Sequence, residues 1–189
     1  MFQVRIHGRG GQGAVTAAEL LSVAAFLEGK YAQAFPSFGP ERSGAPVVAF
    51  CRIDTRPIRL HEPVIEPDTV VVQDATLLHC VDVFQGLEPH GFVLLNSGRS
   101  LDALGLADLV SRLPLSHARV VDASTVAQRC LGRPLPNAAL LGGVAALTGV
   151  VGLDAILEAI MARFRGGTGE GNAAAARAAF ELVGGGASC

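Results

Sequence analysis

The stretch FQVRIHGRGGQGAVTAAELLSVAAFLEG, residues 2–29, combines the signals for a strand, a glycine turn and a helix. Its first part, FQVRIHG (2–8), is short, apolar and partly β-branched, which predicts a strand. Its last part, AVTAAELLSVAAFLEG (14–29), places apolar side chains on one helical stripe and ends in glycine, which predicts a helix. A strand that enters a helix through a glycine turn is typical of the start of an α/β fold.

Three glycines of the turn, Gly8, Gly10 and Gly13, fit the G-x-G-x-x-G spacing of a dinucleotide-binding loop. Such a turn gathers free backbone N–H groups at the positive end of a helix dipole, where phosphate is the natural ligand. We therefore expect an anion site, with a tight structural turn as the alternative. A Rossmann NAD site also needs an acid at the end of the second strand. KYAQAF (30–35) ends at Pro36 without one, so NAD is disfavoured and a phosphorylated adenosine, in NADP or another cofactor, is favoured.

The loop after this second strand, PSFGPERSGAP (36–46), is dense in Pro, Gly and Ser. Arg42 supplies a fork-shaped cation, and Ser43 and the Gly44 backbone can approach a phosphate closely. These features indicate a ligand-facing loop. The alternative is a surface turn in which Glu41 and Arg42 are only solvated.

The composition limits the classes of function. The chain has 189 residues, of which 50% are hydrophobic and 17% charged, and its mean hydropathy is +0.41. This indicates a parallel α/β core covered on both faces, or an apolar surface covered by partner subunits. A net charge of −2, with one Tyr and no Trp, argues against nucleic-acid binding. We expect no membrane insertion, because a spanning helix needs ~18 uncharged apolar residues in a row.

The alternation of strand and helix signals predicts one α/β domain over residues 1–184, with a frayed tail at 185–189. We expect a mostly parallel sheet with a Rossmann-like first βαβ unit and a helical C-terminal third. A hairpin between 46–54 and 56–60 would make the sheet mixed. Strands are expected at 2–8, 30–35, 46–54, 68–74, 90–96 and 119–124, and helices at 14–29, 75–87, 125–132, 137–150, 153–166 and 170–183.

The chain has no pattern of its own for metal or nucleophilic chemistry. Its four cysteines are widely spaced without a C-x-x-C pair, and its five histidines lack metal-site spacing. Without an export signal, reduced thiols and a cytoplasmic location are expected. We find no acid–base dyad or nucleophile elbow and expect no catalytic residue, no metal ligand and no activity of the isolated chain.

A few polar residues have two interpretations each. His7 could contact a ligand beside the glycine turn, although a structural imidazole is favoured. Asp74 could face a ligand at the carboxyl edge of the sheet or cap the next helix. Arg163 and Arg165 near a helix C-terminus are expected to complement its dipole.

Two motifs in order, GRGGQG (8–13) and FPSFGPERSGAP (35–46), are far more specific than a glycine pattern alone. Together with PDTVVVQDATLL (67–78) and GFVLLN (91–96), they make this chain resemble the gamma subunit of the 2-oxoacid:ferredoxin oxidoreductases. The resemblance is continuous over residues 2–96 and looser, but in register, around PLPNAALLGG (134–143) and the C-terminal helices.

This resemblance implies a division of labour. In that family, alpha and beta subunits bind thiamine diphosphate with Mg²⁺, and iron–sulfur clusters, including those of a delta-type subunit, carry electrons. The gamma piece is an α/β domain that helps to bind coenzyme A. The reaction is a reversible oxidative decarboxylation of a 2-oxoacid, such as pyruvate, to acyl-CoA and CO₂.

The resemblance also implies site residues and a hetero-oligomer with those subunits. Arg133, which lies near Asn137 in the sequence, is a further candidate for contact with coenzyme A. A stand-alone NADP-binding Rossmann-type reductase and a purely structural subunit are the alternative functions. The residues that would contact coenzyme A are Gly10, Gly11, Gly13, Arg42, Ser43, Gly44 and Asn137.

Overall fold

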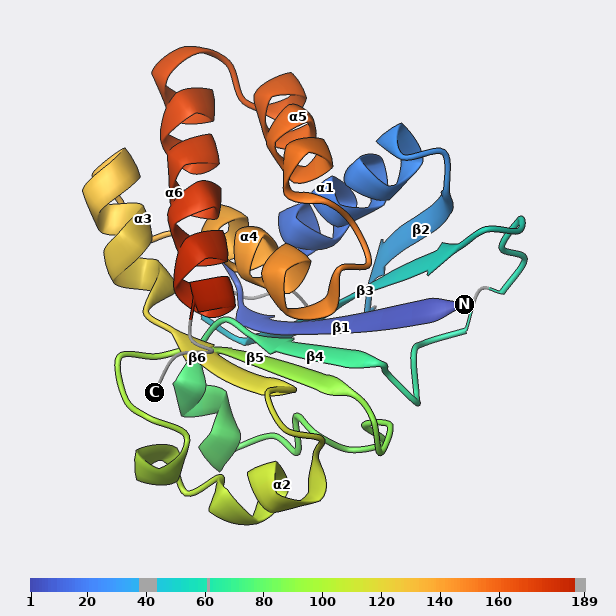
Figure 1. The fold of residues 1–189 in the computed structure, drawn as a ribbon, viewed down its shortest axis with the longest axis vertical. Coiled ribbons are helices and arrows are strands. Elements are labelled where there is room, and N and C mark those ends of the chain that lie inside the picture. Colours follow the sequence, from blue (N-terminus) through green and yellow to red (C-terminus); the bar gives the residue numbers. More distant parts are fainter. Residues whose placement is uncertain (38–43, 61, 186–189) are drawn as a thin grey trace.

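One mixed sheet lies between two unequal layers of helices in the computed structural model, which describes residues 1–37, 44–60 and 62–185 (Figure 1). Within these residues, six strands follow the order β2-β3-β1-β4-β5-β6. The strands are β1 (Phe2–Arg9), β2 (Tyr31–Pro36), β3 (Pro46–Asp54), β4 (Thr69–Val72), β5 (Phe92–Asn96) and β6 (Ala118–Val121). The helices are α1 (Ala14–Leu27), α2 (Ala107–Arg112), α3 (Ala123–Leu131), α4 (Asn137–Thr148), α5 (Leu153–Arg163) and α6 (Gly166–Gly184), with 3₁₀ helices η1 (Ala75–His79) and η2 (Asp102–Leu104).

The strand pairing confirms the mostly parallel, mixed sheet. β1, β4, β5 and β6 are parallel neighbours. β3 is antiparallel to both β1 and β2, with Val4 opposite Cys51 and Ala34 opposite the same cysteine. The strand–helix–strand unit β1-α1-β2 is present as expected, but β3 separates its two strands.

The expected hairpin between 46–54 and 56–60 is wrong, because residues 56–60 form no strand. β3 has no free edge for them, since β1 and β2 already pair with its two sides. The sheet is mixed because of β3 itself.

The expected helix over 75–87 is also wrong beyond its first turn. Only η1 forms, and the carbonyls of Val83 and Gln85 accept hydrogen bonds from Arg5 Nη2 instead of from helical N–H groups. Gly86 has a φ of +72°, which ends any helical path. At the other end of the chain, α6 begins at Gly166, four residues earlier than expected.

Each face of the sheet has its own core. The longer helices α1, α3, α4, α5 and α6 cover one face, and η1, η2 and α2 cover the other (Figure 1). Alternate β4 residues point to opposite faces, so Val71 joins the larger core while Val70 and Val72 join the smaller one. Five of the helices, including α1 that follows the glycine turn, therefore lie on the face with the larger core.

Helices α4 and α6 touch backbone to backbone. A Cβ added at Gly142 would lie 1.9 Å from the Ala176 carbonyl oxygen, so no side chain fits there. A Cβ added at the neighbouring Gly143 would lie 2.8 Å from Cδ2 of Leu94, so the side chain of this β5 residue packs against the α4 backbone. These contacts fix α4 between α6 and the sheet.

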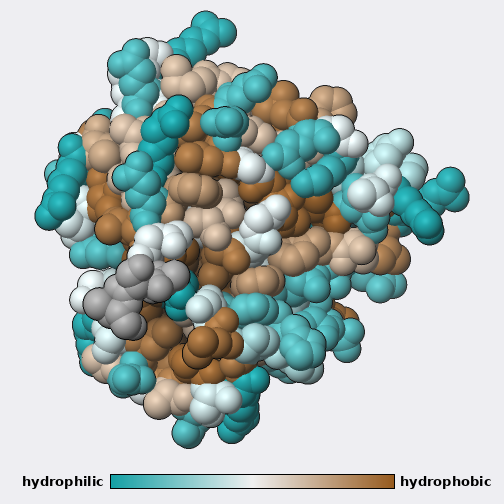
Figure 2. All heavy atoms as spheres, viewed as in Figure 1, coloured by the Kyte–Doolittle hydropathy of each residue, from teal (hydrophilic) through white to brown (hydrophobic). Residues whose placement is uncertain are grey.

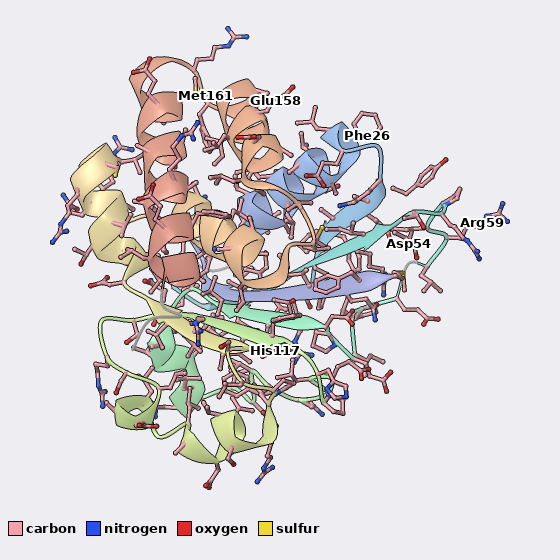
Figure 3. All side chains as sticks on the ribbon, viewed as in Figure 1. Phe26, Asp54, Arg59, His117, Glu158 and Met161 are labelled. Carbon is pink, nitrogen blue, oxygen red and sulfur yellow. The ribbon has the colours of Figure 1, made fainter. Side chains whose placement is uncertain are left out.

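Some large apolar side chains remain on the surface. Phe26 at the end of α1 is 73% exposed, and Leu182 on α6 is 60% exposed. Figure 3 shows Phe26 pointing away from the helix. On the face of the molecule drawn in Figure 2, hydrophobic residues lie across the middle and hydrophilic residues lie around the margin. Coverage of such surface by partner subunits stays a prediction. No helix among the residues described here is long and apolar enough to cross a membrane.

Candidate anion-binding site

The glycine turn has the left-handed backbone that its sequence requires. Gly11 has a φ of +95° and Gly13, the N-cap of α1, a φ of +76°. A Cβ on Gly13 would lie 2.6 Å from Asn137 Nδ2. Glycine is therefore needed at position 13 both for its conformation and for the close approach of α4.

An ion pair below the turn holds it in place. Asp74 Oδ2 accepts hydrogen bonds from Arg9 Nε at 3.1 Å and from Gln12 Nε2 at 2.9 Å. Gln12 Oε1 in turn accepts from the Arg9 backbone N–H at 2.8 Å, which closes the turn. Burial raises the pKa of Asp74, but hydrogen bonds from Thr76 and Gln12 outweigh it and hold that pKa below its usual range. Asp74 also caps η1 through the Thr76 N–H, so both of its polar roles are structural.

The second predicted loop ends beside this turn. Gly10 N–H donates to the Ala45 carbonyl at 2.9 Å, and Gly44 N–H donates to the Gly10 carbonyl at 3.2 Å. Arg9 Nη1 also donates to the Gly44 carbonyl. Arg42 and Ser43 fall in 38–43, outside the described residues. Gly10 and Gly44 therefore join the two motifs to each other.

A cavity of about 500 Å³ opens above the glycine turn. Gly11, Gly13 and Asn137 line one part of it, and Arg133 enters from the segment between α3 and α4. The remaining wall comes from the end of α5 and the start of α6, far away in the sequence. The structure thus brings Asn137 and Arg133, two candidates that the resemblance implies, to the same cavity as the glycine turn. Their role in binding a ligand stays a prediction.

The amino ends of three helices meet at this cavity. Gly13 at the start of α1, Asn137 at the start of α4, and Gly167 with Thr168 in the first turn of α6 all line it. No side chain caps any of these three ends, and none has an acidic residue in its first turn. The first N–H groups of a helix have no partner within the helix and carry its positive dipole end. Backbone donors at the positive dipole ends of three helices therefore line part of the cavity.

The charged side chains add to the positive potential of these helix ends. Arg133 and Arg163 line the cavity, and within the described residues neither guanidinium has a hydrogen bond or an ion-pair partner. Arg163 only lies over the Phe164 ring, 5.7 Å from its centroid. Among the described residues that line the cavity, none is an Asp or a Glu. This is the arrangement that an anionic ligand needs.

Asn137 supplies an unpartnered polar group at the centre of the arrangement. It is 7% exposed, and its side-chain amide makes no hydrogen bond with any residue that the structure describes. Its amide atoms are not among the fully buried polar atoms that lack a partner, so they are open to the cavity that Asn137 lines. Its position against Gly13 makes it a donor or acceptor for a ligand in the cavity.

His7 does not belong to the site. It is 5% exposed, accepts a hydrogen bond from Arg5 Nε at 3.1 Å and does not line the cavity. Burial, together with the nearby Arg5 charge, lowers the pKa of His7 to about 4. His7 is therefore a neutral structural imidazole, which was the favoured interpretation.

Sequence reasoning missed the α5–α6 wall. Arg163 is the last residue of α5 and was expected only to complement its dipole, yet it lines the cavity. A signal was present in RGGTG (165–169), a second glycine-rich turn at the start of a helix that lacks a capping side chain. In the part of the chain that the structure describes, no three His, Cys, Asp or Glu residues are grouped so that they could hold a metal.

Comparisons with known proteins agree over almost the whole chain. A family model described as pyruvate ferredoxin/flavodoxin oxidoreductase matches residues 3–182. The chain is similar to the common gamma subunit of the pyruvate/ketoisovalerate oxidoreductases of Pyrococcus furiosus, with 53% identity over 181 residues, or 96% of each chain. It is also similar to the pyruvate synthase subunit PorC of Methanothermobacter thermautotrophicus, with 50% identity over 97% of this chain and 96% of the relative.

A solved structure shows the same fold. The crystal structure of pyruvate oxidoreductase subunit PORC from Thermotoga maritima superposes with a TM-score of 0.80 at 37% identity, and the match covers 95% of each chain.

Proposed function

Because the chain belongs to the pyruvate ferredoxin/flavodoxin oxidoreductase family, as one of its gamma subunits, we propose that it binds part of coenzyme A in a 2-oxoacid oxidoreductase complex. The complex converts a 2-oxoacid and CoA to acyl-CoA and CO₂. Thiamine diphosphate with Mg²⁺ and iron–sulfur clusters, held by the alpha, beta and delta-type chains, supply decarboxylation and electron transfer. This chain supplies a binding surface and no catalytic residue.

The observation that carries this proposal is the meeting of three uncapped helix N-termini at one cavity with two unpaired arginines. Coenzyme A carries a pyrophosphate and a 3′-phosphate, and both are ligands for backbone N–H groups and guanidinium forks. The volume of about 500 Å³ suits the nucleotide end of the molecule, since small-molecule sites run from roughly 300 to 1,000 Å³. Its reactive thiol would extend toward the partner subunits.

The sheet order weakens the NADP alternative. In a Rossmann fold, the strand after the first helix lies next to the first strand, which brings its end to the ribose. Here β3 lies between β1 and β2, so the end of β2 is one strand further from the glycine turn. We expect the isolated chain to bind NADPH no better than millimolar in a calorimetric titration, and submillimolar binding would favour the reductase.

Kinetics of the complete complex test the CoA proposal against the purely structural subunit. Asn137→Ala and Arg133→Gln each remove one cavity group that bonds no other described residue, so the fold should be kept. Each should raise KM for CoA by about tenfold, since hydrogen bonds to charged groups contribute roughly 1.5–3 kcal/mol, while KM for the 2-oxoacid stays unchanged. Arg129→Gln, an exposed arginine on α3 that does not line the cavity, is the matched control. An unchanged KM for CoA in both variants would leave only the structural role.

A further inference from the structure

The turn between α5 and α6 brings a second group of anion donors to the cavity. Arg163 ends α5, and α6 starts at Gly166 with a φ of +59°. A Cβ at Gly169 would lie 2.4 Å from the Phe164 carbonyl oxygen, so the turn is tightly folded. Gly167 and Thr168 of this first turn line the cavity, and a Cβ at Gly167 would meet nothing within 4 Å, so a ligand has room beside this part of the turn.

This second group is independent of the glycine turn. The first group consists of the amino ends of α1 and α4, which the Gly13–Asn137 contact holds together. The second consists of Arg163 and the amino end of α6, and both line the same cavity. Figure 3 shows Glu158 and Met161 of α5 at the end of the molecule where this turn lies. Asn137 is 7% exposed, and its side-chain amide has no partner among the described residues and opens to this cavity, where a polar ligand can bind it.

Two separate donor groups match a ligand with two separate anionic groups. We propose that the glycine turn takes the pyrophosphate of CoA and that Arg163 with the first turn of α6 takes its ribose 3′-phosphate, so that this turn selects CoA over 3′-dephospho-CoA. A phosphate monoester carries more charge than a bridging diester phosphate and accepts a bidentate guanidinium. The exposed, unpaired Arg163 is suited to it. This inference rests on the proposed function.

The test compares the two nucleotides as substrates of the complete complex. The wild-type complex should have a KM for CoA about tenfold below that for 3′-dephospho-CoA. Arg163→Gln should raise KM for CoA about tenfold and leave KM for 3′-dephospho-CoA within twofold. Arg177→Gln, an exposed arginine further along α6, should change neither value.

A second variant guards against a folding defect. Thr168→Asp places a carboxylate in the first turn of α6, where it favours the helix but repels a phosphate. It should raise KM for CoA selectively while the melting temperature of the chain stays the same or rises.

The outcomes separate this inference from the proposal beneath it. If Asn137→Ala and Arg133→Gln raise KM for CoA, but Arg163→Gln raises both KM values equally or neither, the 3′-phosphate assignment is overturned and CoA binding stands. Equal KM values for the two nucleotides in the wild type overturn it as well. If none of these variants changes KM for CoA, both proposals fail.

Discussion

The helix N-termini of this chain fall into two groups. The described helices whose amino ends do not line the cavity each have a carboxylate there. Asp74 caps η1, and Asp122 caps α3, whose Thr125 N–H it binds at 3.0 Å. The others, η2, α2 and α5, lack a capping side chain but have Asp102, Asp108 and Asp154 in their first turns. At the cavity, α1, α4 and α6 have neither a capping side chain nor an acidic residue in the first turn. A cap contributes about 1 kcal/mol to helix stability. The chain therefore gives up local stability at the three ends where a ligand can take the place of the cap.

Filling the uncapped end of α1 should have the largest effect. Gly13→Asp places a carboxylate at the N-cap and pushes a Cβ against Asn137, so it should raise KM for CoA in the complex about 100-fold, or about 2.7 kcal/mol. Gly13→Ala separates the steric effect from the charge, and should raise KM less. Equal KM values for the two variants would show that the electrostatic potential at the amino end of α1 does not affect CoA binding.

Removing a cap from the other group should cost stability. Asp74→Asn weakens the hydrogen bonds to Arg9, Gln12 and Thr76 and should lower the free energy of unfolding by about 2 kcal/mol, measured by urea denaturation at pH 7.

The same variant has a pH signature. The folded pKa of Asp74 lies below its ordinary value of 3.8, so its contribution is complete above that value and is lost as the pH falls through the folded pKa. The wild-type and Asp74→Asn unfolding free energies should therefore converge in acid. A constant gap from pH 7 to pH 2 would contradict this account.

The smallest effect should come from adding a cap to α6. Arg165 already has the extended N-cap backbone, with φ −98° and ψ 153°, so Arg165→Asp should raise the free energy of unfolding by about 0.5–1 kcal/mol and raise KM for CoA a few-fold. Its counterpart Asp122→Ala should lower stability by about 1 kcal/mol with KM unchanged. Calorimetry would measure the stability of both variants, and kinetics would measure their KM for CoA. The two measurements would show whether a gain in stability weakens CoA binding only at helix ends that line the cavity.

Local patterns explain what could be predicted from the sequence. The strand, glycine turn and helix over 2–29 are encoded by neighbouring residues, and they form as expected. The mixed sheet and the family membership were also predicted correctly. Asn137 was placed in the site only through the resemblance, and the structure puts it against Gly13.

Long-range contacts explain the errors. Nothing within 75–87 indicates that Arg5, some 80 residues earlier, binds the carbonyls that a helix would need. Nothing near 46–60 indicates that β3 is inserted between β1 and β2. Arg163 was assigned to its own helix because its second role depends on how α5 packs near α1 and α4, which no local pattern records.

The contact between Gly142 and Ala176 has a consequence for how the site measures its ligand. Since α4 and α6 meet through main-chain atoms, no rotamer change can widen or narrow their separation there. The separation between the amino ends of these two helices is therefore fixed once the chain has folded. A ligand that spans the two ends needs little reordering of the protein. A ligand with its charges at another spacing cannot bind both helix ends.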